Sequence, residues 1–261
     1  MIYITGDVHG DIVERFNPVM MPGEDRWDEN DILIVTGDFG LIMYPRIDLY
    51  ADKIAQEKKK IEYLEKKPYT VLFCDGNHEN FDRLLTEFPE EERYGGTVKR
   101  IARNVFWLRR SQVYTVSGAS FFVFGGAYSP DKAKRTADDK MISDRFGCPD
   151  RHFTWWPQEL PAKEEYDAAT ANLQARGMRV DYILTHTAPQ TLIQFMKKWP
   201  DDHDRELTGY LDWIYHEVSF RRWYFGHFHD DAELEAFGKK ATMLYFNTVP
   251  LDDGRTAGTD G

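Results

Sequence analysis

Residues able to bind a metal recur in this sequence, each time after a short apolar run. The first group lies in residues 5–10 (TGDVHG), directly after the apolar residues 2–4. Its carboxylate and imidazole, Asp7 and His9, are two positions apart between glycines that let the backbone turn. This pairing suits a metal ion better than a hydrophobic core. Asp-x-His alone is weak evidence, so partners elsewhere in the chain decide its meaning.

Four later segments repeat the arrangement of an apolar run followed by Asp, Asn or His. They are residues 36–40 (TGDFG), 75–79 (DGNHE), 185–189 (THTAP) and 226–229 (GHFH). Because the carboxyl ends of parallel strands face one crevice in an α/β sheet, we expect these side chains to meet. The candidate ligands are Asp7, His9, Asp38, Asn77, His186, His227 and His229.

The mixture of imidazoles, carboxylates and an amide oxygen suits first-row divalent metals such as Mn, Fe or Zn. Seven ligands are too many for one open catalytic site and are appropriate for two ions. Two ions roughly 3.5–4 Å apart need a bridging carboxylate. Asp38 stands alone in its segment, and we predict that it is the bridge. We therefore expect two divalent metal ions as cofactors, with Mn best suited to support activity in vitro.

Each segment has an ordinary explanation when taken alone. A Gly-Asp-x-Gly sequence is commonly a plain turn, and Asn77 could cap a helix. His186 alone would be read as a core histidine, and His227 with His229 as a strand edge. If these ordinary explanations held, all five segments would carry potential ligands at strand ends by coincidence. A metal site is therefore favoured.

The apolar runs that must position these residues predict alternating strands and helices. We predict strands at 31–35, 69–74, 180–184 and 222–225, and helices at 47–66 and 162–176. Strand-helix-strand alternation implies right-handed crossovers and a largely parallel first sheet. Short strands at 98–101, 105–108, 112–116 and 119–124 look antiparallel and predict a second or mixed sheet. Short helices are expected at 79–88, 190–197 and 207–218, and strands near 234–237 and 242–247.

Residues 129–161 have no clear period, and we expect an inserted lid or substrate-binding loop there. The candidate substrate-binding residues in this segment are Lys132, Arg135, Trp155 and Trp156. Cations beside aromatic rings could hold a phosphate and stack a base or sugar. A solvated loop packed down by its tryptophans is the alternative.

Composition sets further limits. The chain has 261 residues, of which 42% are hydrophobic and 15% aromatic, enough to build one domain over residues 1–250 with a loose tail at 251–261. A formal net charge of −11 argues against long nucleic acids and anionic membranes as partners. Two cysteines and no long apolar run exclude a disulfide framework and a membrane span, which predicts a cytoplasmic protein.

In this order, GDVHG, GDFG, GNHE, THTAP and GHFH resemble the motifs of the calcineurin-like metallophosphoesterase superfamily. The resemblance covers nearly the whole chain. It implies a single-domain α/β fold, a two-sheet β-sandwich flanked by helices in four layers. It assigns one metal to Asp7, His9, Asp38 and His229, and the other to Asp38, Asn77, His186 and His227. His78 matches the family's catalytic histidine, which is not a ligand.

The resemblance implies a phosphoesterase in which a hydroxide bridging the two metals attacks phosphorus. The sequence departs from the protein phosphatase branch, because no second Asp and no Arg follow Asp38 in residues 39–41 (FGL). What orients His78 is therefore open, with Asp75, Glu79 and Asp82 nearby in sequence.

We predict a phosphomonoesterase or phosphodiesterase acting on a small or nucleotide phosphoester. A protein phosphatase, a nuclease and a catalytically silent metal-binding scaffold are the alternatives. The short second motif counts against the first, the acidic charge against the second and the presence of His78 against the third.

Overall fold

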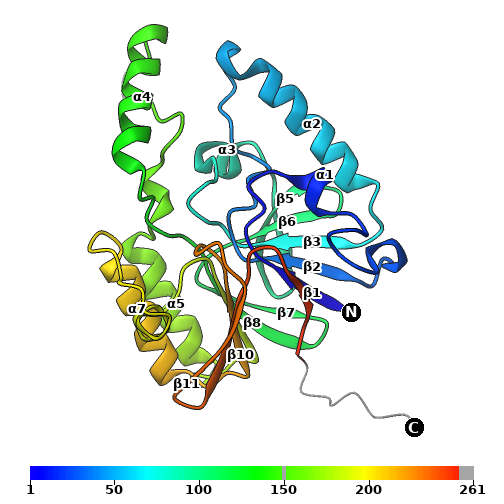
Figure 1. Cartoon of the computed structure of the whole chain (residues 1–261), viewed down its shortest axis with the longest axis vertical. Coiled ribbons are helices and arrows are strands. Elements are labelled where there is room, and N and C mark those ends of the chain that lie inside the picture. The colour runs from blue at the N-terminus through cyan, green and yellow to red at the C-terminus, as the bar shows by residue number, and fades with distance from the viewer. Residues whose placement is uncertain (149–150, 253–261) are drawn as a thin grey trace.

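The computed structural model describes residues 1–148 and 151–252, and two face-to-face β-sheets form its centre (Figure 1). The first sheet has the strand order β13-β1-β2-β3-β6-β5-β4, and the second β11-β12-β10-β9-β8-β7. The first sheet contains β1 (Ile2–Thr5), β2 (Ile32–Val35), β3 (Thr70–Phe73), β4 (Glu90–Arg93), β5 (Gly96–Ala102), β6 (Val105–Leu108) and β13 (Thr248–Pro250). The second contains β7 (Gln112–Val116), β8 (Ala119–Phe124), β9 (Tyr182–Thr185), β10 (Arg222–Phe225), β11 (Ala232–Ala236) and β12 (Lys239–Met243).

Helices cover the outer faces of both sheets. They are α1 (Ile12–Arg15), α2 (Ala51–Glu65), α3 (Phe81–Thr86), α4 (Lys132–Phe146), α5 (Lys163–Ala175), α6 (Gln190–Phe195) and α7 (Arg205–Glu217). Short 3-10 turns lie at Glu24–Arg26, Asp48–Tyr50 and Pro157–Glu159. Within the described residues, no helix is both long enough and apolar enough to cross a membrane.

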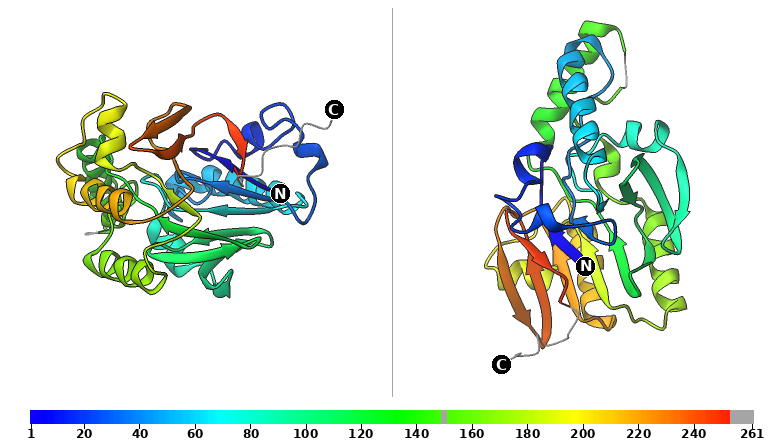
Figure 2. Two further views of the ribbon diagram at one scale, coloured as in Figure 1. Left: turned by 90° about the horizontal axis from the view of Figure 1, so that it is seen from below. Right: turned by 90° about the vertical axis from the view of Figure 1, so that its right-hand side faces the viewer.

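Three hydrophobic clusters separate four layers. One packs α1 to α3 against the outer face of the first sheet, through residues such as Ile12, Leu64 and Phe73. A second fills the space between the sheets, and a third packs α5 to α7 against the second sheet. The view from below shows the two sheets lying one above the other (Figure 2). The predicted sandwich of two sheets flanked by helices is confirmed.

Each sheet has a parallel centre and antiparallel edges. Strands β1, β2, β3 and β6 are parallel, and so are β8, β9, β10 and β12. The predicted parallel first sheet therefore holds at its centre. The predicted antiparallel strands form two pairs, with β5 and β6 in the first sheet and β7 and β8 in the second. As a result, both sheets present carboxyl strand ends to the same region.

The prediction of an irregular loop across residues 129–161 was wrong over its first half, where α4 forms a helix of 15 residues. The buried positions of α4 are Arg135, Asp139 and Ile142, which have helical spacing. Because two of these three side chains are charged, the sequence shows no apolar period there. Figure 1 shows α4 extending beyond the sheets. The predicted tail at 251–261 lies outside the described residues from position 253 onward.

Candidate metal centre

The side chains from the five motifs converge where strands of both sheets end. Asp7 follows β1, Asp38 follows β2 and Asn77 follows β3, all in the first sheet. His186 follows β9, and His227 follows β10 in the second sheet. The cluster is mostly buried, with 0% of His186 and 1% each of Asp7 and Asp38 exposed.

Potential ligand atoms form three groups that share residues. Within each group, the ligand atoms all lie within 4.8 Å of one another. They are Asp7 with His9 and His229, His9 with Asp38 and His78, and Asp7 with Asp38 and His186. The Nε2 atoms of His9 and His229 are 3.0 Å apart, and Asp7 Oδ2 is 3.3 Å from His229 Nε2. Asp7 and Asp38 each belong to two groups, so either carboxylate can serve two ions.

Asn77 and His227 complete the convergence in different ways. Asn77 Oδ1 lies 3.1 Å from His186 Nε2, which places the amide oxygen beside the imidazole. His227 belongs to none of the three groups found among the described residues. Its ring lies edge-on to the ring of His186, with centroids 5.1 Å apart. Its assignment as a ligand stays a prediction.

Four of these residues have backbone angles that side chains rarely adopt. The φ angles are +50° at His9, +46° at Asp38, +69° at His227 and +51° at His229. Left-handed conformations of non-glycine residues cost of order 1–3 kcal/mol each and concentrate at functional sites. Six other described non-glycine residues also have positive φ angles, so the strain at four predicted ligands is consistent with a functional site but does not by itself identify one.

Glycines beside the ligands allow this close packing. A Cβ atom at Gly76 would collide with Asp38 Oδ1, and one at Gly226 would collide with Asp7 Oδ1. The glycines of the GNHE and GHFH motifs therefore keep space for the two carboxylates. This explains in steric terms why a glycine precedes the predicted ligands Asn77 and His227.

The charges in the cluster favour a bound cation. Burial alone would raise the pKa of Asp38, but His186, which lies 3.3 Å away, holds that pKa well below its usual range. Burial opposes protonation of His186, yet Asp38 and Asp7 raise the pKa of its imidazole to about 10. Two carboxylates thus retain a proton on a fully buried histidine. A divalent metal ion would take the place of that positive charge.

The donor set fits two divalent metal ions of the first transition row. Burial, with His186 as a second cause, lowers the pKa of His227 to about 4, so this imidazole is neutral and able to bind a metal. Carboxylates, neutral imidazoles and an amide oxygen are the ligands such ions take.

His78 lies at the edge of the cluster and is half-buried. Its backbone N–H donates to Asp38 Oδ1 over 2.8 Å, and its ring lies 5.3 Å from that of His9. Burial lowers the pKa of His78, while the nearby charge of Asp38 opposes that shift.

The three carboxylates considered as partners of His78 are engaged elsewhere or exposed. Asp75 accepts from Trp107 Nε1 over 3.0 Å and pairs with Arg110 at 2.6 Å. Glu79 accepts from the backbone N–H of Phe39 over 2.8 Å. Asp82 is exposed on α3. Asp131 is another acidic neighbour, and its negative charge acts to raise the pKa of the His78 imidazole.

A buried polar network behind Asn77 has no signal in the motifs. Asn77 Nδ2 donates to Ser129 Oγ over 3.0 Å, and Ser129 Oγ donates to Glu159 Oε2 over 2.5 Å. Arg135 Nη1 donates to Ser129 Oγ over 2.6 Å, and Arg135 Nη2 pairs with Glu159 at 3.0 Å. With its amide nitrogen held by Ser129, Asn77 directs its oxygen toward His186.

The four predicted substrate-binding residues separate into two pairs. Arg135 and Trp156 are buried and line a cavity of about 260 Å³ that also contains His78. Lys132 and Trp155 are half-buried and contact each other, with Lys132 Nζ 4.3 Å from the ring centroid of Trp155. Lys132 and Trp155 do not line this cavity. Their role in substrate binding stays a prediction.

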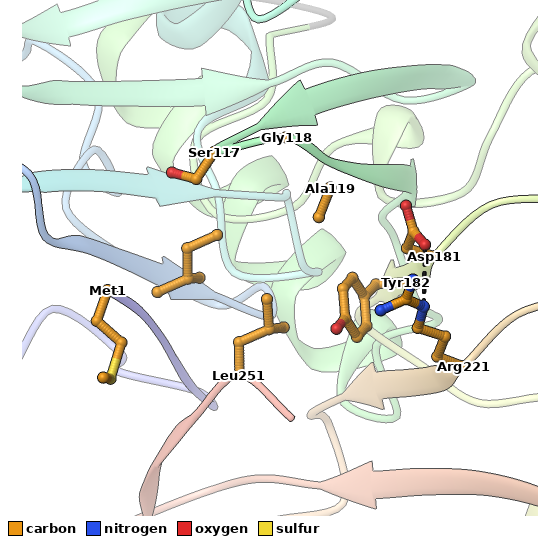
Figure 3. Close-up of a pocket in the computed structure, with 9 residues that line it drawn as sticks. Met1, Ser117, Gly118, Ala119, Asp181, Tyr182, Arg221 and Leu251 are labelled. Atoms are coloured by element: carbon orange, nitrogen blue, oxygen red, sulfur yellow. Dashed lines mark ion pairs between the residues drawn. The ribbon is translucent and has the colours of Figure 1, made fainter. Parts of the chain in front are cut away.

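A larger cavity of about 490 Å³ lies away from the metal ligands (Figure 3). It is lined by residues including Met1, Ser117, Tyr182 and the ion pair of Asp181 with Arg221 at 3.0 Å. No histidine lines this cavity, and none of the predicted ligands reaches it. The chemistry is therefore expected at the smaller cavity beside His78.

Comparison with known proteins now identifies the class. Residues 1–231 match the calcineurin-like phosphoesterase family. The chain belongs to this family, as its motifs predicted. No curated protein matches the chain.

The solved structures to which the chain is similar have low sequence identity. A phosphopantetheinyl hydrolase from Mycobacterium tuberculosis is 16% identical, with 98% of both chains covered and a TM-score of 0.45. A putative 5′-nucleotidase from Staphylococcus aureus is 13% identical over 93% of this chain and 48% of its own, with a TM-score of 0.46. GAP50, the anchor in the inner membrane complex of Plasmodium, is 9% identical over 94% of this chain and 70% of its own, with a TM-score of 0.51. The likeness to GAP50 shows a shared fold.

Proposed function

We propose that this protein is a metal-dependent phosphoesterase that hydrolyses a small or nucleotide phosphoester at a dinuclear centre. The observation that carries the proposal is the convergence of carboxylates and imidazoles, within 4.8 Å in each group, where strands of both sheets end. One ion would be held by Asp7, His9, Asp38 and His229. The other would be held by Asp38, Asn77, His186 and His227.

When bound, the ions supply positive charge to the phosphoryl oxygens and lower the pKa of water to near neutrality. The chain's own residues supply the rest. The backbone N–H of His78 holds Asp38 Oδ1 and so fixes the orientation of that carboxylate. His78 lines the cavity, and in this proposal an imidazole N–H of His78 gives a proton or a hydrogen bond to the leaving-group oxygen. General-acid assistance of this kind contributes ~10²–10⁴-fold to rate.

Hydrolysis of p-nitrophenyl phosphate and bis-p-nitrophenyl phosphate in the presence of Mn²⁺ tests this proposal. We expect turnover by the wild-type protein and none by Asp38→Asn, because that substitution weakens the ligand proposed to bind both ions. Asp144→Asn, at an exposed position of α4, is the matched control and should behave as wild type. The ester hydrolysed faster distinguishes a monoesterase from a diesterase. A wild-type protein that neither binds Mn²⁺ nor hydrolyses either ester would contradict the proposal.

A further inference from the structure

The cavity beside His78 has aromatic walls from two separate parts of the chain. Tyr44 and Tyr50 come from the segment before α2, and their rings are 5.3 Å apart at 38°. Phe153 and Trp156 come from the segment after α4, and each is 1% exposed. Phe153 and Trp156 are too buried to offer a face to a ligand, whereas the half-buried rings of Tyr44 and Tyr50 can stack on a planar group, because offset stacking gives close contact over the face of a ring.

Two carboxylates, Asp131 and Asp138, and one guanidinium, Arg135, line the cavity, and Arg135 has partners within the protein. The guanidinium of Arg135 is held by Glu159 at 3.0 Å and by the carbonyl oxygen of Thr154 at 2.5 Å. Asp138 lines the cavity and forms no ion pair with any residue in 1–148 or 151–252. Asp131 lies farther from Arg135, at 3.8 Å, and its side chain is 49% exposed.

Two carboxylates facing a small cavity select the charge of its ligand. They accept hydrogen bonds from N–H donors and repel a second phosphate or a carboxylate. The volume of about 260 Å³ is below the usual range of ~300–1,000 Å³ for drug-sized ligands. The space therefore suits a single ring system and excludes a polymer.

We propose that this cavity binds part of the leaving group of the substrate, and that this part is a planar nitrogen heterocycle that carries N–H donors and no negative charge. This inference rests on the proposed function for one point, the position of the phosphate. His78 connects the two sites, since it belongs to the ligand cluster and also lines the cavity. A phosphate bound at the cluster would direct its ester oxygen past His78 and its leaving group toward Tyr50.

Adenosine 5′-monophosphate and glycerol 3-phosphate test the cavity, because both are phosphomonoesters and only the first has a planar base with an amino group. With Mn²⁺ present, we expect a higher kcat/KM for adenosine 5′-monophosphate. Tyr50→Ala should lower that value about tenfold or more, as loss of one aromatic stacking partner does elsewhere. The kcat/KM for glycerol 3-phosphate should change much less. Tyr50→Phe should keep the preference, because it keeps the ring.

The variant Asp138→Asn distinguishes the contribution of the carboxylate charge to ligand binding from the contribution of aromatic stacking. It should reduce the preference for adenosine 5′-monophosphate over inosine 5′-monophosphate, which has a carbonyl oxygen in place of the amino group. Phe146→Ala and Asp144→Asn on the same helix are the controls and should keep both preferences, because neither residue lines the cavity.

A binding measurement separates failure of this inference from failure of the proposed function. Adenosine binding to the protein in EDTA, followed by calorimetry, needs no catalysis. Binding that Tyr50→Ala weakens about tenfold would support the cavity even if neither ester were hydrolysed. The inference is overturned if adenosine does not bind in EDTA, or if Tyr50→Ala and Asp138→Asn leave adenosine binding and both substrate preferences unchanged.

Discussion

Asn77 shows how residues far apart in sequence set the direction of a single side chain. Its amide could present either oxygen or nitrogen to the cluster, and only the oxygen can bind a metal. Ser129 decides between them, because its Oγ already accepts from Arg135 and donates to Glu159. Ser129 lies after β8, outside the five motifs, and a lone serine in a variable segment gives no sequence signal. Sequence analysis predicted Asn77 as a ligand but gave no account of what orients it.

Ser129→Ala is expected to weaken Mn²⁺ binding about 10- to 100-fold, because residues that orient metal ligands contribute affinity of this size. The measurement is a calorimetric titration with Mn²⁺, which requires no turnover. Ser143→Ala, on α4, is the matched control and should leave the affinity unchanged. Unchanged Mn²⁺ affinity in Ser129→Ala would show that Asn77 is oriented without Ser129.

The carboxyl of Asp204, which lies outside the metal site, should make the free energy of unfolding depend on pH. It is 5% exposed, and burial, with Asp201 as a second cause, raises the pKa of its carboxyl to about 6. An aspartate in the unfolded chain has a pKa of about 3.9. Between about pH 4 and pH 6 the folded protein binds more protons than the unfolded chain, so the free energy of unfolding falls as pH rises through this window.

Asp204→Asn removes this titration. The free energy of unfolding of the variant, relative to wild type, should therefore rise by about 2 kcal/mol from about pH 4 to about pH 7. Urea unfolding at the two pH values measures it. The exposed neighbour Asp202→Asn is the control and should show little change. Equal pH dependence in wild type and Asp204→Asn would mean that water reaches this carboxyl.

At the scale of elements, apolar runs in the sequence predicted strands correctly, whereas charged segments concealed one strand and one helix. The strands β1, β2, β3 and β10 lie within two residues of their predicted ends, because they are buried on both faces and read as continuous apolar runs. Strand β4 (EEER) was missed, since an exposed edge strand needs no apolar residue and its pairing with β5 is set by the turn between them. The helix α4 was missed for the related reason that its buried face is largely charged.

The helix α4 should open independently of the rest of the protein. Its one buried apolar residue is Ile142, whereas α5 packs Ala169 and Leu173 against the second sheet. Ala137→Gly, at an exposed position of α4, should speed amide hydrogen exchange over residues 132–146 by about fivefold, because glycine costs about 1 kcal/mol in a helix. The midpoint of global unfolding should not move.

Ala168→Gly, at an exposed position of α5, is the comparison. The same cost of about 1 kcal/mol should appear there as a lower midpoint of global unfolding, because α5 unfolds with the core. If Ala137→Gly lowered the global midpoint as much as Ala168→Gly does, α4 would be part of the cooperative core.

At the scale of the whole molecule, metal binding should stabilise both sheets together. The predicted ligands come from three strands of the first sheet and two of the second, so the bound state requires the sandwich to be intact. Free Mn²⁺ at about 100 times its dissociation constant should raise the free energy of unfolding by ~2.7 kcal/mol for each ion bound, or roughly 5–10 °C in Tm for each. Differential scanning calorimetry with Mn²⁺ and with EDTA measures it.

Asp38→Asn should lose most of this stabilisation, and Asp144→Asn should keep it. An equal rise in Tm for wild type and Asp38→Asn would place the Mn²⁺ site elsewhere in the protein.

The order of the motifs was enough to predict the sandwich and which residues meet at its strand ends. It did not predict how strands are divided between the sheets, because β5 to β8 form consecutive hairpin-like pairs whose sequences do not show where one sheet stops. Of the cavity walls, the sequence indicated Arg135 and Trp156 but missed Tyr44 and Phe153, which have no pattern in common and meet only in the folded chain. Local sequence predicts which residues belong to one helix or strand. Contacts between residues of distant segments depend on how these elements pack.

The position of β1 between β2 and β13 has a consequence for how the protein is made. Strand β1 lacks one of its two neighbours until residues 248–250 have been translated, and His227 and His229 are also translated late. At about 5–20 residues per second, Asp7 and His9 wait roughly 10–45 s for these histidines to be synthesised. The proposed metal centre is therefore expected to be among the last features to form during synthesis, and a truncated nascent chain that stops before residue 227 would carry His78 without the full set of predicted ligands.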